Sequence, residues 1–432
     1  MSTALLTDHY ELTMVDAARA SHRADRLAVF EVFSRSLPGG KRYGVVAGTA
    51  RLIDAVAHFR FHQNELEFLS RHSIVGPDTL EWLANYRFSG TIRGYREGEI
   101  YVPGSPILQV EGTFAEAVLL ETLILSILNY DCAVASAASR MVQAAGSRDL
   151  IEMGARRAHE QAAVAAARAA YLAGFSATSN LAAGEAYGIP TKGTAAHSFT
   201  LVHNSEEEAF AAQIATMGPG TTLLIDTYDM RQGVERAIAV AGTSLGAVRI
   251  DSGDLPVVVS QVRAHLDELG AKDTKIVVTN DLNEHTIAGL RGAPVDVFGV
   301  GTSVVTGSGF PAAGLVYKLV ARTDDQGHWI PVAKKSSHKG NPGGTKTAYR
   351  ILDSGSAREE RLVLGTHSPP QGGRTLSHDY VLSGVAQHEG TPGELLAAAR
   401  QHHSQVIAEL PDTAFSLSPG DPAFPVSLVG EE

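Results

Sequence analysis

The sequence predicts an α/β protein with a parallel sheet or barrel at its centre. Four short runs rich in Val, Ile and Leu lie between residues 222 and 307, in TLLIDTYD, GAVRIDSGD, TKIVVTND and VDVFGVGTSVVTG. The segments between them, such as LPVVVSQVRAHLDELG and LNEHTIAGLRG, carry apolar residues at helical spacing. Because alternating strands and helices are typical of parallel sheets, we expect this series to organise the chain.

The composition is that of a globular protein, with 432 residues of which 44% are hydrophobic and 19% are charged. This length suits two domains, or one barrel with a large addition. The formal net charge of −11 argues against nucleic acid as a partner, because binding to phosphate backbones needs a basic face. The single cysteine, Cys132, excludes a disulfide framework and a cysteine zinc site, and it fits a reducing cytoplasm.

Two further segments favour a cytoplasmic protein without a membrane partner. The N-terminal stretch MSTALLTDHYELTM lacks a basic region followed by an apolar core, so we expect no signal peptide. The apolar segment AVLLETLILSIL is interrupted by Glu121 and is too short to span a bilayer, which predicts a buried helix.

Residues 1–112 predict an α+β domain. Residues 7–20 have the pattern of a capped helix, LAVFEVFSRSL that of a strand, and PGGKRYG that of a basic, glycine-rich turn. Helical spacing follows over residues 43–85, and short strands separated by turns follow over residues 88–112.

Residues 113–312 are expected to form the barrel domain. Residues 114–145 and the alanine-rich stretch 156–174 predict helices, and residues 178–188 a shorter one. GIPTKGTAAHSF predicts a further strand, and its end carries Thr194, His197 and Ser198.

Residues 313–432 return to the period of two that is typical of strands. GLVYKLVARTDDQGHWIPVAKK predicts a hairpin, TAYRILD and ERLVLG predict two more strands, and PGELLAAARQHHSQVIAEL a closing helix. Because both ends of the chain share an α+β character, we expect the C-terminal strands to complete the N-terminal domain.

Polar residues follow each of the four central strands. Active sites of parallel α/β proteins form where strands end and loops begin. The residues to examine are therefore Asp226, Asp251, Asn280 with Asp281, and Gly301 with Thr302.

Ordinary structural roles remain open for these residues. Asp226 and Asp229 could cap the helix that follows them, or bind hydroxyl groups and steady positive charge. Arg249 and Asp251 face the same side of their strand and could bind a sugar phosphate or form a structural ion pair. The glycines of FGVGTSVVTG could bring backbone amides to an anion or only form the turn.

Three other features raise the same choice between binding and structure. The segment EMGARRAHE puts Arg156 and Arg157 at the expected start of a helix, where the helix dipole disfavours positive charge. This placement indicates an anion-binding site, unless Glu152 and Glu160 neutralise the two arginines. His197 lies among small residues that leave room for a ligand, although a lone histidine is usually structural. The lysine loop, residues 334–347 (KKSSHKGNPGGTKT), is either a solvated loop or a lid for phosphates.

Eight motifs occur in an order that resembles the nicotinate phosphoribosyltransferase family. They are TDHYELTM, FSRSLPGGKRYG, EMGARRA, GTAAHSF, LLIDTYD, VRIDSGD, VVTNDLNE and FGVGTSVVTG. The resemblance runs from residue 7 to the lysine loop, where KGNPGGTKTAYR is similar to the family's pattern, and it is thin past Tyr349.

The resemblance implies a quinolinate-phosphoribosyltransferase-like (type II) α/β barrel with an α+β N-terminal domain, in a homodimer with shared active sites. The reaction would join nicotinate to phosphoribosyl pyrophosphate, with ATP hydrolysis coupled to it, and give nicotinate mononucleotide and pyrophosphate in the salvage route to NAD. Mg²⁺ would be held mainly by the pyrophosphate and water, so few protein ligands and no obvious metal-binding motif are expected.

The resemblance also implies roles for single residues. His197 would be the catalytic residue that ATP phosphorylates, and Asp226 and Asp251 would stabilise the ribosyl carbon as it becomes cationic. The nicotinate contacts would be Tyr10, stacking on the ring from the neighbouring subunit, together with Arg156, Thr194 and Arg249. The phosphoribosyl pyrophosphate contacts would be Gly301, Thr302 and Asp251.

Other activities stay open. Nicotinamide-using relatives carry an aspartate where Ala195 stands here, and two nearby arginines suit a carboxylate better than an amide. Nicotinamide phosphoribosyltransferase is therefore the first alternative, and a quinolinate enzyme would need more basic residues. A non-catalytic phosphate-binding barrel would not need to retain all of these groups. A Schiff-base aldolase is disfavoured, because it would need a buried lysine at a strand end, and Lys192, which comes nearest, lies at the start of its predicted strand.

Overall fold

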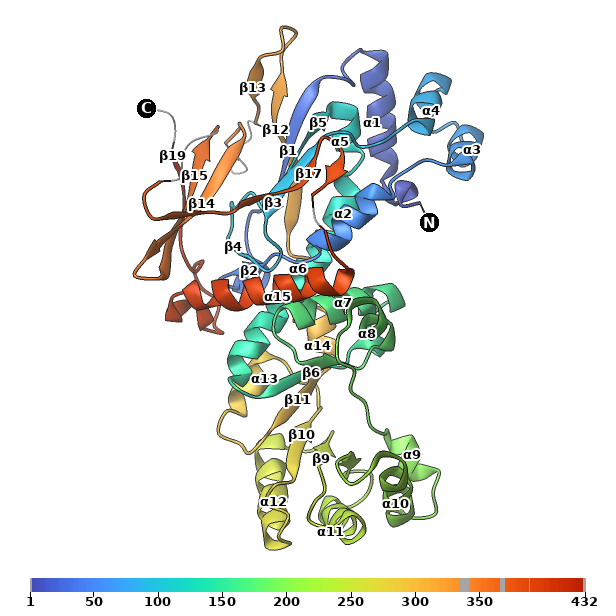
Figure 1. Cartoon of the computed structure of the whole chain (residues 1–432), viewed down its shortest axis with the longest axis vertical. Coiled ribbons are helices and arrows are strands. Elements are labelled where there is room, and N and C mark those ends of the chain that lie inside the picture. The colour runs from blue at the N-terminus through green and yellow to red at the C-terminus, as the bar shows by residue number, and fades with distance from the viewer. Residues whose placement is uncertain (1, 334–341, 366–369, 388, 430–432) are drawn as a thin grey trace. The chain divides into compact units, whose positions relative to one another are not determined.

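The computed structural model describes residues 2–333, 342–365, 370–387 and 389–429 (Figure 1). The chain divides into two compact units, which are unit 1 (Met1–Ala135 with Phe310–Glu432) and unit 2 (Ser136–Gly309). The two ends of the chain thus belong to the same unit. The sequence placed the domain boundaries at 112/113 and 312/313, and the units meet along the chain at 135/136 and 309/310.

Unit 1 is built on an antiparallel sheet with the strand order β13-β12-β1-β5-β3-β17-β18. Its strands are β1 (Leu27–Ser34), β3 (Thr91–Tyr95), β5 (Leu108–Thr113), β12 (Leu315–Thr323), β13 (Trp329–Pro331), β17 (Ser377–Leu382) and β18 (Val385–Ala386). A second sheet holds β16 (Gly373–Thr375), β14 (Lys346–Asp353), β15 (Ser356–Leu364) and β19 (Val426–Val429), and a third pairs β2 (Gly44–Val45) with β4 (Ile100–Tyr101).

The interior position of β1 follows from its sequence, LAVFEVFS. All but its first residue are buried, and β12 and β5 pair with it along its two edges. Phe30 of β1 stacks on Tyr317 of β12 with ring centroids 4.7 Å apart. The expected hairpin is confirmed, since β12 and β13 pair around the DDQG turn.

The helices of unit 1 begin much as the sequence predicts. Asp8 and Glu11 form a capping box at the start of α1 (His9–Ala20). The others are α2 (Thr49–Ala57), α3 (Gln63–Arg71), α4 (Pro77–Ala84), α5 (Phe114–Val118) and α15 (Pro392–Val406), with short 3-10 turns η1 (Ala4–Leu6), η2 (Pro38–Gly40), η4 (Ile407–Glu409) and η5 (Asp412–Phe415).

Helix α6 (Glu121–Ala145) runs across the boundary between the units. The helical stretch Phe114–Ala145 is long and apolar enough to cross a membrane by length and composition, and it extends beyond the apolar segment from which the sequence predicted a buried helix. Inside the structure, 61% of its most apolar window is buried, as expected for a core helix.

Unit 2 contains one parallel sheet with the strand order β7-β6-β11-β10-β9-β8. The four expected strands are confirmed as β8 (Thr222–Leu224), β9 (Ala247–Ile250), β10 (Lys275–Val278) and β11 (Val297–Val300), and the sequence missed β6 (Asp149–Glu152) and β7 (Ala177–Thr178). The helices are α7 (Glu160–Leu172), α8 (Leu181–Tyr187), α9 (His197–Leu201), α10 (Glu206–Met217), α11 (Met230–Ala241), α12 (Leu255–Glu268), α13 (Glu284–Gly289) and α14 (Thr302–Val305), with the 3-10 turn η3 (Ala155–Arg157).

The barrel expectation needs correction, because the described strands form an open sheet that ends at β7 and β8. The strand predicted in GIPTKGTAAHSF is also wrong. Only Thr191 makes a single bridge, to Thr178, and His197 begins α9 instead of ending a strand. Glycine and alanine offer little side chain to pack on a sheet, which explains why this stretch stays a loop.

The alanine-rich helix starts later than predicted. Helix α7 begins at Glu160, and the His159 side chain accepts a hydrogen bond from the Gln161 amide as its N-cap. Arg156 and Arg157 lie upstream in η3, so they do not occupy the first turn of that helix.

Candidate active site

The carboxyl ends of the unit 2 strands bring polar residues from distant sequence positions to one edge of the sheet. In Figure 1 the strands β6, β11, β10 and β9 follow one another in this order. The expected residues at this edge are Asp226, Asp251, Gly301 and Thr302. Glu152, Thr178, Thr227, Ser252 and Thr279 also take part, although none was a site candidate in the sequence.

Asp226 has a buried side chain in which one carboxylate oxygen accepts two hydrogen bonds and the other accepts none. Its Oδ2 accepts hydrogen bonds from the Asp251 amide at 2.8 Å and the Ser252 hydroxyl at 2.7 Å. Its Oδ1 is buried without a hydrogen-bond partner in the part of the chain that the structure describes. Asp229, not Asp226, caps α11 through a 2.9 Å bond from the Gln232 amide, so a capping role for Asp226 is wrong.

His197 lies between a hydroxyl group and two carboxylates. Its Nδ1 is 3.1 Å from Thr227 Oγ1, and its Nε2 is 3.9 Å from both Asp226 Oδ1 and Asp251 Oδ2. The Thr279 hydroxyl donates to Asp251 Oδ1 and fixes that carboxylate. Because 39% of the His197 side chain is exposed, the ring is oriented and still accessible to a reactant.

Arg249 points to the loop that precedes His197. Its Nη1 donates to the Ala195 carbonyl at 3.1 Å and lies 3.5 Å from Thr194 Oγ1. Burial lowers the pKa of Arg249, the charge of Arg156 lowers it further, and the carboxylates of Asp251 and Asp226 oppose both effects. Two guanidinium groups are thus close enough to interact, an arrangement that suits a carboxylate ligand.

The acidic neighbours of Arg156 and Arg157 do not neutralise them. Glu152 is fully buried, and its carboxylate bonds to the Thr178 hydroxyl and the Gly154 amide instead. Glu160 pairs with His159 at 3.7 Å. Both arginines are exposed, so they are available to an anion from outside the chain.

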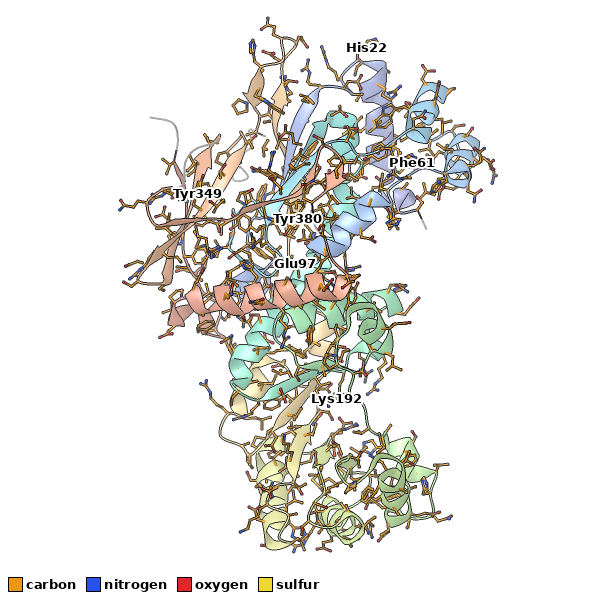
Figure 2. All side chains as sticks on the ribbon, viewed as in Figure 1. His22, Phe61, Glu97, Lys192, Tyr349 and Tyr380 are labelled. Atoms are coloured by element: carbon orange, nitrogen blue, oxygen red, sulfur yellow. The ribbon has the colours of Figure 1, made fainter. Side chains whose placement is uncertain are left out.

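The remaining expected residues are more dispersed. Gly301 and the exposed Thr302 form the turn from β11 into α14. Tyr10 belongs to unit 1, where 49% of it is exposed; burial, followed by the charge of Glu121, raises the pKa of its phenol. Lys192, labelled in Figure 2, is exposed, which further disfavours a Schiff-base site.

The lysine loop is only partly described. Lys334, Lys335 and Lys339 lie outside the described residues. Lys346 is buried in β14 and pairs with Glu31 at 2.7 Å, so it is a structural residue of unit 1 and not a lysine of a solvated loop.

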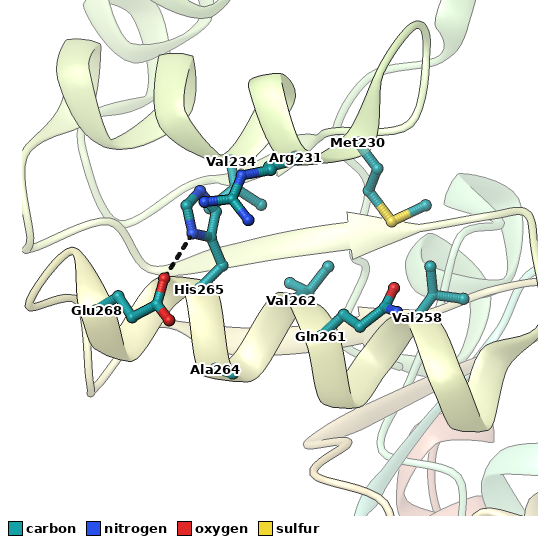
Figure 3. A pocket seen from close by; sticks show the side chains of 9 residues that line it. All are labelled: Met230, Arg231, Val234, Val258, Gln261, Val262, Ala264, His265 and Glu268. Carbon is teal, nitrogen blue, oxygen red and sulfur yellow. Dashed lines mark hydrogen bonds and ion pairs between the residues drawn. The ribbon is translucent and has the colours of Figure 1, made fainter.

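A separate groove lies between helices α11 and α12 (Figure 3). Its volume is about 450 Å³, and His265 closes one end through a 3.3 Å contact with Glu268. None of the expected site residues lines it. Within the described ranges there is no group of three or more His, Cys, Asp or Glu that could hold a metal ion.

Comparisons with known proteins show which family this chain resembles. The nicotinate phosphoribosyltransferase N-terminal domain model matches residues 5–129, and the nicotinate phosphoribosyltransferase family model matches residues 149–341. Nicotinate phosphoribosyltransferase pncB1 of Mycobacterium tuberculosis is 52% identical over 98% of this chain and 95% of its own length. The nicotinate phosphoribosyltransferase of Bacillus subtilis is 38% identical over 83% of this chain and 75% of its own length.

A solved structure extends the comparison to three dimensions. The human nicotinic acid phosphoribosyltransferase has a TM-score of 0.79 and 26% identity, and the match covers 98% of this chain and 97% of that one. Both family models fall on the motifs that form the strand-end site in unit 2 and the capped helix in unit 1. The chain therefore belongs to the nicotinate phosphoribosyltransferase family.

Proposed function

We propose that this protein joins nicotinate to phosphoribosyl pyrophosphate, with ATP hydrolysis coupled to the transfer, and releases nicotinate mononucleotide and pyrophosphate. This is the first step of the nicotinate salvage route to NAD. One observation carries the proposal beyond family membership: a histidine, two carboxylates and a partly buried arginine converge at the strand ends of unit 2.

The carboxylates would act on the sugar. As pyrophosphate leaves, the ribosyl carbon becomes cationic, and fixed negative charge nearby stabilises that transition state more than the ground state. Asp226 is suited to this role because its free Oδ1 is buried and its Oδ2 is already held by two donors, so little reorganisation is needed.

The arginines would determine which base the site binds. Arg249 and Arg156 would pair with the carboxylate of nicotinate, with Thr194 beside them. Ala195 has no side-chain acceptor for an amide, and Arg249 already binds its carbonyl. These contacts favour nicotinate over nicotinamide.

His197 would couple ATP to the reaction. Its imidazole would accept the γ-phosphoryl group of ATP, with ADP as the leaving group, and later release phosphate to water. Thr227 holds one ring nitrogen, and the other nitrogen faces Asp226 and Asp251. The added negative charge would change how the site holds pyrophosphate.

The chain's residues fit a Mg²⁺ ion that is held mainly by the substrate. Asp226 Oδ1 and the partly exposed Asp251 carboxylate are oxygen groups of the kind that this ion or its waters prefer. When bound, the ion would neutralise charge on the pyrophosphate. Gly301 and Thr302 would contact the phosphates from the turn after β11.

Three further parts of the proposal concern the whole protein. We expect a cytoplasmic homodimer in which the exposed ring of Tyr10 stacks on the nicotinate of the neighbouring subunit. The relationship to type II phosphoribosyltransferases is supported by the parallel sheet with polar strand ends. The domain division would follow the two units, with the C-terminal strands completing unit 1.

The test is a choice between two bases. Purified protein with Mg²⁺, ATP and phosphoribosyl pyrophosphate receives either nicotinate or nicotinamide, and mononucleotide formation is followed. A higher kcat/KM with nicotinate supports the proposal. Preference for nicotinamide would overturn the assignment of the arginine pocket, and no product from either base would favour a non-catalytic phosphate-binding protein.

A further inference from the structure

Glu152 is a buried carboxylate that the proposed chemistry does not use. It ends β6, and none of its surface is exposed to solvent. Its Oε2 accepts from the Thr178 hydroxyl at 2.6 Å, and its Oε1 accepts from the Gly154 amide. Burial raises the pKa of this carboxyl, and the two hydrogen bonds oppose that shift.

The Gly154 amide belongs to the turn that carries the arginines. We call residues 154–157 the arginine turn; it consists of Gly154 and η3, and the Arg157 amide closes it on the Gly154 carbonyl at 2.8 Å. One Glu152 oxygen therefore holds the first residue of this turn, while the other is anchored on the neighbouring strand β7. A buried carboxylate is costly to desolvate, so the placement of Glu152 depends on these two hydrogen bonds.

The arginine turn also packs against the turn after β11. We call residues 301–305 the phosphate turn. The Met153 amide donates to the Val300 carbonyl at 2.8 Å, directly before both turns. A Cβ atom on Gly154 would lie 2.3 Å from Val305 Cγ1 and 2.8 Å from the Gly301 carbonyl oxygen. Only a glycine allows the two turns to approach this closely.

We infer that Glu152 is a positioning residue that, with Gly154, fixes the arginine turn against the phosphate turn and so sets the spacing between the base and phosphate sites. The inference deepens the proposed function and rests on it. Glu152 touches neither substrate. Instead, Glu152 orients the Arg156 side chain, and loss of that orientation weakens recognition of the nicotinate carboxylate.

The central variant is Glu152→Gln. The amide keeps the size of the side chain but removes its charge, and because only its oxygen can accept, at most one of the Gly154 amide and the Thr178 hydroxyl can still donate to it. We expect the KM for nicotinate to rise by about tenfold while kcat and the KM for ATP stay within about twofold. Selectivity for nicotinate over nicotinamide should fall by the same factor. A purely structural role would lower all activities together.

Glu160→Gln is the matched control, because it removes the same charge eight residues away from an exposed side chain. It should leave every kinetic constant unchanged. Thr178→Val removes the second partner of Glu152 and should raise the KM for nicotinate in the same direction. Gly154→Ala should raise the KM values of nicotinate and phosphoribosyl pyrophosphate together, because the added methyl group pushes the two turns apart.

The outcomes separate this inference from the proposed function. If the wild-type protein makes no nicotinate mononucleotide, the proposed function fails. If it does, but Glu152→Gln and Thr178→Val both keep the wild-type KM and selectivity, the positioning role is overturned. Should Glu152→Gln not fold, Thr178→Val and Gly154→Ala decide the matter by the same readouts.

Discussion

The backbone amide of Asp251 donates a 2.8 Å hydrogen bond to the carboxylate of Asp226, so the end of β9 is tied to the loop after β8. This bond occupies Asp226 Oδ2 and leaves Oδ1 facing His197 Nε2 at 3.9 Å. The arrangement is set before any substrate arrives. The fixed orientation of the Asp226 carboxylate is the basis of the predictions for the sugar, the base and ATP.

Asp226→Asn should lower kcat by about a hundredfold, because the amide carries no charge toward the cationic ribose. The amide oxygen of Asn can still accept both hydrogen bonds that Asp226 Oδ2 accepts, so the loss of activity reports the lost charge. Steady-state kinetics at saturating substrates measure the effect. Ser252→Ala is the control that removes only one of those bonds, and its loss of activity should be much smaller. An Asp226→Asn protein with nearly wild-type kcat would contradict this role.

Arg249→Met should weaken nicotinate more than nicotinamide. A charge-assisted hydrogen bond is worth about 2 kcal/mol, which corresponds to a rise of about thirtyfold in the KM for nicotinate. The KM for nicotinamide should change little. Arg231→Met provides the control, because Arg231 is a largely exposed arginine in the same unit that lies in the groove by α11. Equal losses for both bases would show that Arg249 only supports the loop at Ala195.

A shared active site predicts complementation between two inactive proteins. Tyr10→Ala and Asp226→Asn would each disable a different half of the site if the halves come from different subunits. Mixing the two after exchange of subunits should restore about a quarter of wild-type activity, because half of the dimers are mixed and each has one intact site. The measurement is mononucleotide formation before and after exchange. Activity that stays at the level of the separate variants would place Tyr10 and Asp226 in the same subunit's site, or Tyr10 outside it.

The stability of unit 1 should fall at acid pH through Glu99. Burial would raise the pKa of this carboxyl, but hydrogen bonds from His402 and Arg374 outweigh it and lower the pKa from 4.5 to about 2. Because the folded pKa is depressed, its stabilisation is complete above about pH 5 and is lost as the pH falls toward 2. The difference of 2.5 units corresponds to about 3 kcal/mol.

Denaturant unfolding of the wild type and of Glu99→Gln between pH 7 and pH 2 tests this. The gap in free energy of unfolding between the two proteins should close as the pH falls. Asp379→Asn, which removes an exposed ion pair with Arg93, should cost less than about 1 kcal/mol and serves as the control. A gap that is constant with pH would mean that Glu99 does not titrate in this range.

The sequence predicts those parts of the fold in which a local pattern decides the structure. Strands β8 to β11 are short apolar runs between amphipathic helices, and α1 carries its own capping box. Strand β6 was missed because its two apolar residues are flanked by acidic ones, and β7 was missed because it has only two residues. Thr191 makes only an isolated bridge to Thr178, and no described strand connects it to β8 in the sheet. Such pairing joins residues far apart in the sequence, so local patterns could not predict that the sheet is open.

The sequence singled out the charged residues of the candidate site but not the hydroxyl residues that contact them. These ionisable residues lie at strand ends or in motifs, where charged side chains often have a functional role. They are Asp226, Asp251, Arg249 and His197. Thr227, Ser252 and Thr279 follow strands in the same way, but hydroxyl residues are common in loops and give no distinct signal. Pairs such as Glu31 with Lys346 are 315 residues apart, and only the folded structure brings them together.

The most direct test is the effect of ATP on nicotinate mononucleotide formation by the wild type and by His197→Ala. Both proteins are incubated with Mg²⁺, nicotinate and phosphoribosyl pyrophosphate, with and without ATP, and product is followed over time. We predict that ATP stimulates the wild type, and that His197→Ala retains a slow, ATP-independent synthesis with no stimulation. Stimulation by ATP that survives in His197→Ala would contradict the proposal that ATP acts through phosphorylation of His197.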